Sequence, residues 1–314
     1  MNHEQRKVND KRIKAGGGQA VTNENMFRVY AAVTLGNFFW GISNILTRIA
    51  VSVADPEILL TFRFLTAFVI LSVMMLVKKE RFSIHKSVFP ALVLMAVTEP
   101  LIYFGEGYGI KLSNASFASM ITATTPISSI AFAALLLKEY PTRRQIFYSL
   151  VAVAGILLIT AQGQQMGYVH PVGAVILILA VIITGLYRTA NRKAAEGFST
   201  LQRTWAVFLV CMITFTLTSL IRNHGDLSVY TDALSHPEFV ASFVLLAVLS
   251  SAAAHVLVNY GYKYLSVLSV SIFAILQNVI GIFAGILILH EPATPTILIG
   301  SAMIILSIYM VNRA

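Results

Sequence analysis

Ten apolar stretches recur along almost the whole chain, separated by short connections that carry proline, glycine, asparagine or charge. Each has about 15 to 25 residues, and a helix needs roughly 20 apolar residues to cross about 30 Å of hydrocarbon. Backbone polar groups find no water inside a bilayer, so each stretch is expected to be a helix. The ten predicted spans cover residues 27–51, 58–77, 88–110, 115–137, 146–160, 172–189, 204–221, 239–262, 265–289 and 296–311.

Composition excludes a soluble globular protein. The chain is 57% hydrophobic and 12% charged, and its mean hydropathy is +0.75. The charged fraction is about half that of a soluble domain. The predicted fold class is therefore an all-α integral membrane protein with the lipid bilayer as its surroundings.

Residues 1–26 differ from the rest of the chain. They are polar and basic, and they include three consecutive glycines at 16–18. Such a segment cannot bury enough apolar surface to fold, so we predict a disordered cytoplasmic tail. The apolar stretch that follows is too long for the core of a signal peptide and has no clear cleavage site after it, so it is expected to remain as the first span.

Lysine and arginine are distributed unevenly between the connections. Alternate connections are rich in them, as around Lys78, Arg143 and Lys193, whereas the intervening ones are nearly bare, with Arg222 alone at the edge of the longest loop. Because basic connections stay in the cytoplasm, we predict a multi-pass protein of the cell membrane, such as a bacterial inner membrane, with both termini cytoplasmic. The net charge of +9 then reflects topology, and no nucleic-acid partner is expected.

Residues that catalysis, metals or redox chemistry would need are scarce. Cys211 is the single cysteine, and His255 is the only histidine deep inside a predicted span. The sequence has no Gly-x-Ser-x-Gly elbow, no His-Glu-x-x-His pair and no Walker loop. We predict no disulfide, metal site or cofactor, and neither an enzyme nor an ATP-driven pump.

The two halves of the chain resemble each other at a shift of about 152 residues. The segment LLLKEYPT then corresponds to LILHEPAT. The aligned pairs include Tyr108 with Tyr260, Gly109 with Gly261 and Glu139 with Glu291, and Arg63 can be set against Arg203.

This repeat predicts two units, residues 27–163 and 164–314, with five spans each. Because five is an odd number, the second copy must enter the membrane in the opposite orientation. Inverted repeats with a site near the midplane at their interface are typical of secondary transporters that work by alternating access. We therefore expect ten transmembrane helices arranged as two inverted five-helix repeats.

Several segments resemble one known family. NFFWGISNILTRIA in the first span, TFRFLTAF in the second and LSNASFASMITATTPISSIAFAALLLKEYPTRRQ across the fourth are similar to the EamA branch of the drug/metabolite transporter superfamily. The resemblance covers residues 28–312 and implies a ten-helix, inverted-repeat carrier of small metabolites. In bacterial members of this family, transport is often outward. The matching positions are Trp40–Gly41, Arg63, Thr125–Pro126 and Glu139. The second copy departs from the first by placing Asn278 at the position of Pro126.

The third span is the richest in polar groups. Glu99, Tyr103 and Glu106 follow each other at spacings of four and three, so they share one helical face. Ionisable groups at membrane depth are costly and mark functional sites. We predict a cavity wall with Glu99 as the proton-coupling residue, and the alternative is a protonated, hydrogen-bonded carboxyl with no transport role.

Other polar residues at similar depth extend this predicted site. Arg63 lies at the depth of Glu106, so an ion pair between Glu106 and either Arg63 or Arg48 is expected to gate the outer end. His255 and Asn259 share a face of the eighth span, and a metal role for His255 is rejected because the ligand set is poor. The remaining candidates for substrate binding are Asn37, Trp40, Asn44, Thr125, Tyr187, Trp205, Gln277 and Asn278.

These features predict a secondary active transporter of small metabolites. The favoured version is an exporter of amino acids or related small polar or amphipathic compounds, with protons as the candidate coupling ion. The alternatives are a lipid or lipid-linked sugar translocase and a multidrug efflux carrier of the same architecture. A channel would fit the spans but would not explain an inverted repeat with a polar midplane.

Overall fold

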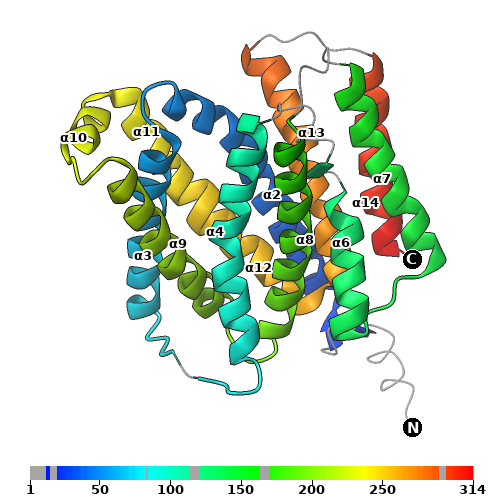
Figure 1. Ribbon diagram of the computed structural model, residues 1–314. Helices are drawn as coiled ribbons and strands as arrows, with labels where there is room; N and C mark the ends of the chain where they lie inside the picture. Colours follow the sequence, from blue (N-terminus) through cyan, green and yellow to red (C-terminus); the bar gives the residue numbers. More distant parts are fainter. Residues whose placement is uncertain are drawn as a thin grey trace.

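The structure is a computed structural model that describes residues 12–14, 20–82, 84–112, 121–122, 124–162, 170–289 and 295–313, and these residues are nearly all helical (Figure 1). The first half contains α2 (Asn23–Val51), α3 (Pro56–Val77), α4 (Phe89–Leu112), α6 (Thr125–Phe132), the π-helix η1 (Ala133–Leu137) and α7 (Arg143–Gln162). The second half contains α8 (Pro171–Ala194), α9 (Thr200–Arg222), α10 (Ser228–Ser235), α11 (Pro237–Leu245), the π-helix η2 (Leu246–Ala253), α12 (Ala254–Tyr264), α13 (Val267–Leu289) and α14 (Pro295–Arg313).

Part of the amino-terminal tail has local structure that the sequence does not predict. Strands β1 (Arg12–Lys14) and β2 (Ala20–Thr22) form an antiparallel pair in which Ile13 faces Val21. These β-branched residues favour an extended backbone. Helix α2 begins at Asn23, inside the segment expected to be disordered, and the rest of that segment lies outside the described residues.

Seven helices among the described residues are long and apolar enough to cross a membrane. One of them, 237–264, is built from α11, η2 and α12 in succession. Two shorter apolar helices, Thr125–Leu137 and Val267–Gly281, and helix α7 lie where three further spans are expected. The arrangement agrees with an all-α membrane protein.

Helices of the two halves alternate in the bundle. α4 packs along α8, α6 also contacts α8, and α2 packs along α12 and α13 in the middle of the molecule. α3 pairs with α9 at one side, and α7 pairs with α14 at the other (Figure 1). The centre of the bundle is therefore built from both halves of the chain.

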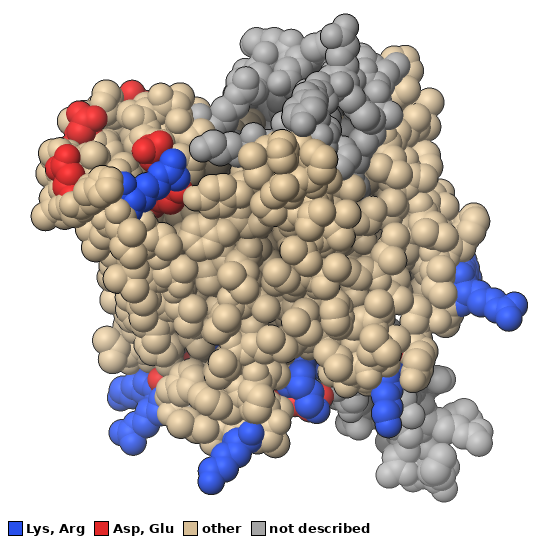
Figure 2. All heavy atoms as spheres, in the orientation of Figure 1, with Lys and Arg blue, Asp and Glu red and all other residues tan. Residues whose placement is uncertain are grey.

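The outer surface is apolar around the bundle and charged at its ends. Leu76, Leu135 and Ile221 are more than 70% exposed, which suits contact with acyl chains rather than with water. Figure 2 shows lysine and arginine side chains gathered along the lower edge, and acidic side chains at the upper end where α10 lies.

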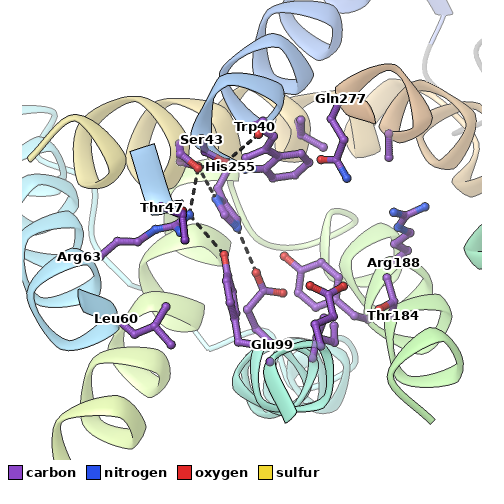
Figure 3. Close-up of a pocket in the computed structure, with 18 of the residues that line it drawn as sticks. Trp40, Ser43, Thr47, Leu60, Arg63, Glu99, Thr184, Arg188, His255 and Gln277 are labelled. Carbon is purple, nitrogen blue, oxygen red and sulfur yellow. Dashed lines mark hydrogen bonds and ion pairs between the residues drawn. The ribbon is translucent and has the colours of Figure 1, made fainter. Parts of the chain in front are cut away.

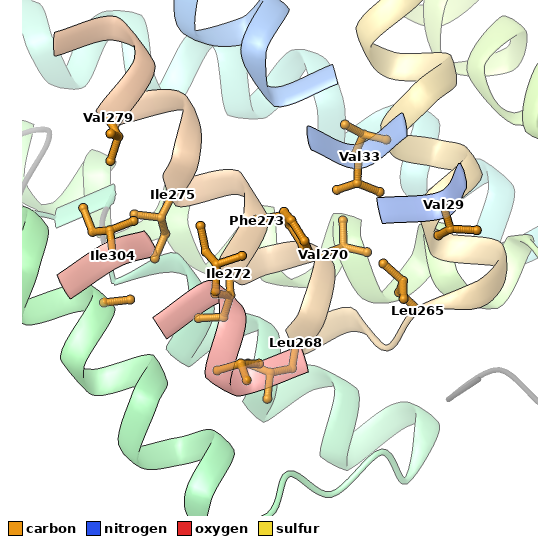
Figure 4. Close-up of a cluster of buried hydrophobic side chains, with 14 of the residues drawn as sticks. Val29, Val33, Leu265, Leu268, Val270, Ile272, Phe273, Ile275, Val279 and Ile304 are labelled. Carbon is orange, nitrogen blue, oxygen red and sulfur yellow. The ribbon is translucent and has the colours of Figure 1, made fainter. Parts of the chain in front are cut away.

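Inside the bundle, branched apolar side chains interlock between helices. Val33 of α2, Val270 and Ile272 of α13 and Ile304 of α14 are at most 1% exposed and belong to one cluster (Figure 4). Because lipid is as apolar as these side chains, helix association depends on close contact rather than on the hydrophobic effect.

Two glycines bring α7 and α14 into such contact. A Cβ built on Gly155 would lie 2.8 Å from the carbonyl oxygen of Gly300, and a Cβ on Gly300 would lie 2.6 Å from the carbonyl oxygen of Gly155. Backbone atoms cannot move aside as a flexible side chain can. Any side chain at either position would therefore push the two helices apart.

We expect Gly155→Ala to lower the thermal unfolding midpoint of the detergent-purified protein. The methyl group costs about 1–3 kcal/mol of overpacking, more than the up to about 1 kcal/mol that alanine gains over glycine in a helix. Gly107→Ala is the matched control, because nothing lies within 4 Å of its Cβ. An equal or higher midpoint for Gly155→Ala would contradict this close packing.

Candidate functional site

A cavity of about 420 Å³ lies between the two halves (Figure 3). Its walls come from α2, α3, α4, α8, η2, α12 and α13. The lining reaches Val51 and Pro56, two exposed residues beside the α2–α3 connection, so the cavity opens at that end. Nine residues that the sequence predicts for substrate binding line it: Trp40, Arg63, Glu99, Tyr103, Glu106, Tyr187, His255, Asn259 and Gln277.

Glu99 of α4 and His255 of α12 form a buried pair in this cavity (Figure 3). Glu99 Oε1 lies 3.0 Å from His255 Nε2, and the two residues are 6% and 3% exposed. His255 Nδ1 lies 3.1 Å from the carbonyl oxygens of Ser250 and Ser251. Carbonyl oxygens only accept hydrogen bonds, so Nδ1 must carry a proton.

The proton content of the pair follows from this geometry. With Nδ1 protonated, the bond between Nε2 and Oε1 contains one proton, either on the carboxyl or on the imidazole. In both forms the pair is neutral overall, which suits a buried site. Loss of that proton would leave one uncompensated negative charge.

Aromatic rings and the π-helix hold His255 in place. Trp40 meets the imidazole edge to face at 5.0 Å between ring centroids, and Phe208 meets it at 4.9 Å. Trp40 Nε1 donates to the same Ser250 carbonyl oxygen at 2.9 Å. Ser250 lies in η2, and π-helical turns inside α-helices occur frequently at functional sites.

Arg63 does not form the ion pair that the sequence predicts. Its Nε donates to the Ser251 hydroxyl at 2.7 Å, and its Nη2 donates to the hydroxyls of Ser250 at 2.9 Å and Tyr103 at 3.4 Å. Glu106 makes no ion pair among the described residues. The expectation of an Arg63–Glu106 contact is wrong for this structure, because the Arg63 guanidinium donates to hydroxyls of η2 and α4 instead. The side chain of Arg48 lies outside the described residues.

Four predicted residues do not line the cavity. Asn37 is fully buried and donates to the Val33 carbonyl oxygen at 2.7 Å, so its amide serves its own helix. Trp205 Nε1 donates to Ser72 at 2.9 Å, between α9 and α3. Asn278 follows Gln277 on α13 but is not among the lining residues. The side chain of Asn44 lies outside the described residues.

Thr125 is the fourth predicted residue that does not line the cavity, and the helix around it differs from the prediction. Its hydroxyl donates to the Thr122 carbonyl oxygen, and Pro126 lies in the first turn of α6 rather than inside a continuous helix. Proline fits a first turn because its missing N–H has no helical partner there. At this position the proline therefore leaves no carbonyl oxygen without its helical partner, and no such oxygen has to face the cavity.

Several residues that line the cavity are not predicted from the sequence. Ser43 and Thr47 continue the helical face of Trp40, a spacing that could have found them. Thr184 and Tyr262 carry no charge and are hard to distinguish from packing residues. Arg188 lies near the inner end of its predicted span, where a basic residue is typical of a cytoplasmic connection, yet its side chain lines the cavity (Figure 3).

A buried polar network surrounds Asn259, one of the residues that line the cavity. Arg203 of α9 is fully buried; its Nη1 donates to the Asn191 carbonyl oxygen at 3.2 Å and its Nη2 to the Asn259 carbonyl oxygen at 2.8 Å. Asn191 Nδ2 donates to Asn259 Oδ1 at 2.6 Å, and Asn259 Nδ2 donates to the Thr204 hydroxyl at 2.9 Å. Arg203 thus joins α8, α9 and α12 through neutral acceptors.

Each half of the chain also matches the model of a known protein family. The model of the EamA-like transporter family matches residues 28–161 and again residues 171–313. A Bacillus subtilis protein named "Uncharacterized transporter YcxC" is 28% identical over 89% of this chain and 91% of its own length. The "Probable terminal-alkyne amino-acid exporter" of Streptantibioticus cattleyicolor is 27% identical over 70% of each chain. A solved crystal structure shares the fold, with a TM-score of 0.76 and 16% identity over 91% of this chain and 96% of the other.

We expect Arg203→Lys to lower the free energy of unfolding by about 3 kcal/mol, because an ammonium cannot fork to two helices as a guanidinium does. The measurement is the unfolding midpoint in detergent. Arg143→Lys, at an exposed position, is the matched control and should leave the midpoint unchanged. Equal midpoints for the two variants would show that the network contributes nothing to stability.

Proposed function

Because the chain belongs to the EamA-like transporter family, we propose that it is a secondary active carrier that exports amino acids or related small metabolites by alternating access. The observation that carries this proposal is the Glu99–His255 hydrogen bond, which buries an acid and a base side by side in a cavity between the two halves. The cavity reaches exposed residues beside the α2–α3 connection, and access from one side is what one state of an alternating-access carrier requires.

The architecture proposed is ten transmembrane helices in two inverted five-helix repeats. The packing pairs support it: α4 contacts α8 as α12 contacts α2, and α6 contacts α8 as α13 contacts α2. When each helix is replaced by its equivalent in the other half, the α4–α8 contact becomes the α12–α2 contact and the α6–α8 contact becomes the α13–α2 contact. α3 with α9 and α7 with α14 are pairs of equivalent helices, as expected near a twofold axis.

The proposed proton site is Glu99 together with His255. Releasing the shared proton to the open end would leave a buried negative charge, and taking up a proton from the other side would restore neutrality. The free-energy cost of this buried negative charge differs between the two conformations of the proposed carrier. This difference couples the movement of the proton to the change of access. Trp40, Arg63, Tyr103 and Gln277 are the proposed substrate contacts in the same cavity.

The substrate class follows from the cavity and from a relative. A volume of about 420 Å³ lies in the range of small-molecule pockets and favours a metabolite over a lipid-linked sugar. The named amino-acid exporter among the relatives agrees with this size. Counterflow in liposomes, in which an internal pool of L-amino acids accelerates uptake of a labelled L-amino acid, tests the carrier mechanism against a channel or an enzyme.

The proposed location is the cell membrane with both termini cytoplasmic, supported by the basic connections at one end of the bundle (Figure 2). In a Cys211→Ser background, a cysteine replacing Asp226 should react with a membrane-impermeant maleimide on intact cells. Asp226 lies in the exposed connection between α9 and α10. Labelling only after permeabilisation would reverse the orientation.

The coupling role of Glu99 predicts a separation of two activities. In proteoliposomes, Glu99→Gln should abolish transport of labelled L-amino acids driven by a pH gradient, because glutamine neither takes up nor releases a proton. Exchange of substrate for substrate should remain largely intact. Glu238→Gln, at an exposed position, is the matched control. A wild-type response to pH in Glu99→Gln would remove Glu99 from coupling, and loss of exchange would assign it to the substrate site.

A further inference from the structure

Two side chains of opposite charge type in the cavity have no hydrogen-bond or ion-pair partner within the described part of the chain. The Glu106 carboxylate on α4 makes no hydrogen bond or ion pair there, and Arg188 Nη1 on α8 is buried without a hydrogen-bond acceptor. We propose that these two groups recognise a zwitterion, with Glu106 accepting the ammonium and Arg188 binding the carboxylate of a free amino acid. The inference rests on the proposed carrier function and names the chemistry that its cavity selects.

The other acidic and basic side chains of the cavity already have hydrogen-bond partners. Glu99 and His255 share one proton and are neutral as a pair. Arg63 directs Nε and Nη2 to three hydroxyls on η2 and α4. A polar group without a hydrogen bond in a site of low dielectric is costly, so the charged groups of the cavity that still need hydrogen-bond partners are one carboxylate and one guanidinium.

The placement of these groups leaves room for a ligand between them. α4 and α8 pack closely, with the position of a Cβ on Gly105 only 2.9 Å from Ala180 Cβ. Arg188 lies eight residues beyond Ala180, about 12 Å along the helix at 1.5 Å per residue, whereas Glu106 lies beside Gly105. The long arginine side chain spans part of that distance. No hydrogen bond or ion pair joins Glu106 and Arg188 in the described part of the chain.

An α-amino acid matches this arrangement better than a singly charged compound. An amine alone would leave the guanidinium unpaired, and a carboxylic acid alone would leave the carboxylate unpaired. Planar guanidinium suits bidentate binding of a carboxylate. Leu59, Leu60 and Ile102 in the same cavity provide an apolar wall for a side chain.

The test compares free L-amino acids with derivatives that lack one charge. Dissociation constants of the purified protein are measured for the twenty L-amino acids, and for the amide and the N-acetyl form of each one that binds. Nucleosides, neutral sugars and quaternary ammonium compounds complete the panel. We expect at least one free amino acid to bind tenfold or more tightly than either of its derivatives.

Each charge is then removed separately. Arg188→Gln should lower affinity for the free amino acid about tenfold and abolish its preference over the amide, while keeping the preference over the N-acetyl form. Glu106→Gln should do the reverse. Arg143→Gln and Glu238→Gln, both exposed, should change neither ratio. If Arg188→Gln does not fold, Arg188→Lys should retain the preference over the amide at lower affinity.

Unchanged ratios in both cavity variants would overturn the proposal, as would binding of other compounds with no binding of any amino acid at millimolar concentration. Counterflow of the same compounds separates this result from failure of the carrier function. An amino acid that binds with charge-dependent ratios but gives no counterflow contradicts the carrier and supports the zwitterion site. Counterflow of a neutral compound alone supports the carrier and overturns the site.

Discussion

The hydrogen bond between Glu99 and His255 joins the two halves of the chain at the depth where a charge is most costly. One shared proton satisfies both side chains, and the remaining imidazole nitrogen is satisfied by backbone carbonyls of η2. Trp40 packs on the imidazole and donates to the same turn. Glu99, His255 and Trp40 thereby connect α4, α12 and α2 to one turn of η2.

Arginines in the middle of the bundle and arginines at its ends bind different kinds of partner. Arg63 and Arg203, inside the bundle, bind hydroxyl, amide and carbonyl oxygens. At the ends of the bundle, Arg222 pairs with Glu57, and Arg192 pairs with Glu139 at 3.2 Å. A neutral acceptor can be exchanged for another without leaving a carboxylate stranded. The inner contacts are thus better suited to change between two states than the ion pairs at the edges.

Helical periodicity explains why many of the residues that line the cavity can be predicted from the sequence. Glu99, Tyr103 and Glu106 share a face because of their spacing, and the structure directs that face to the cavity. Trp40 was identified because tryptophan and asparagine in mid-span have little reason to face lipid, but Asn37 on the same face bonds to its own helix. Periodicity states which residues share a face. It does not state which neighbour takes up a hydrogen-bonding group.

The sequence by itself determined that this chain is helical and membrane-embedded, since only helices satisfy the backbone of long apolar segments in lipid. It also placed Glu99 and His255 at similar depths on different helices. Only the tertiary structure decided that these two share a proton, that Arg63 turns to serines of η2 instead of Glu106, and that Arg188 points into the cavity. The reason is physical: partners across the bundle are chosen by rotation of each helix about its axis and by distances of a few ångströms, and both depend on packing between segments more than 100 residues apart.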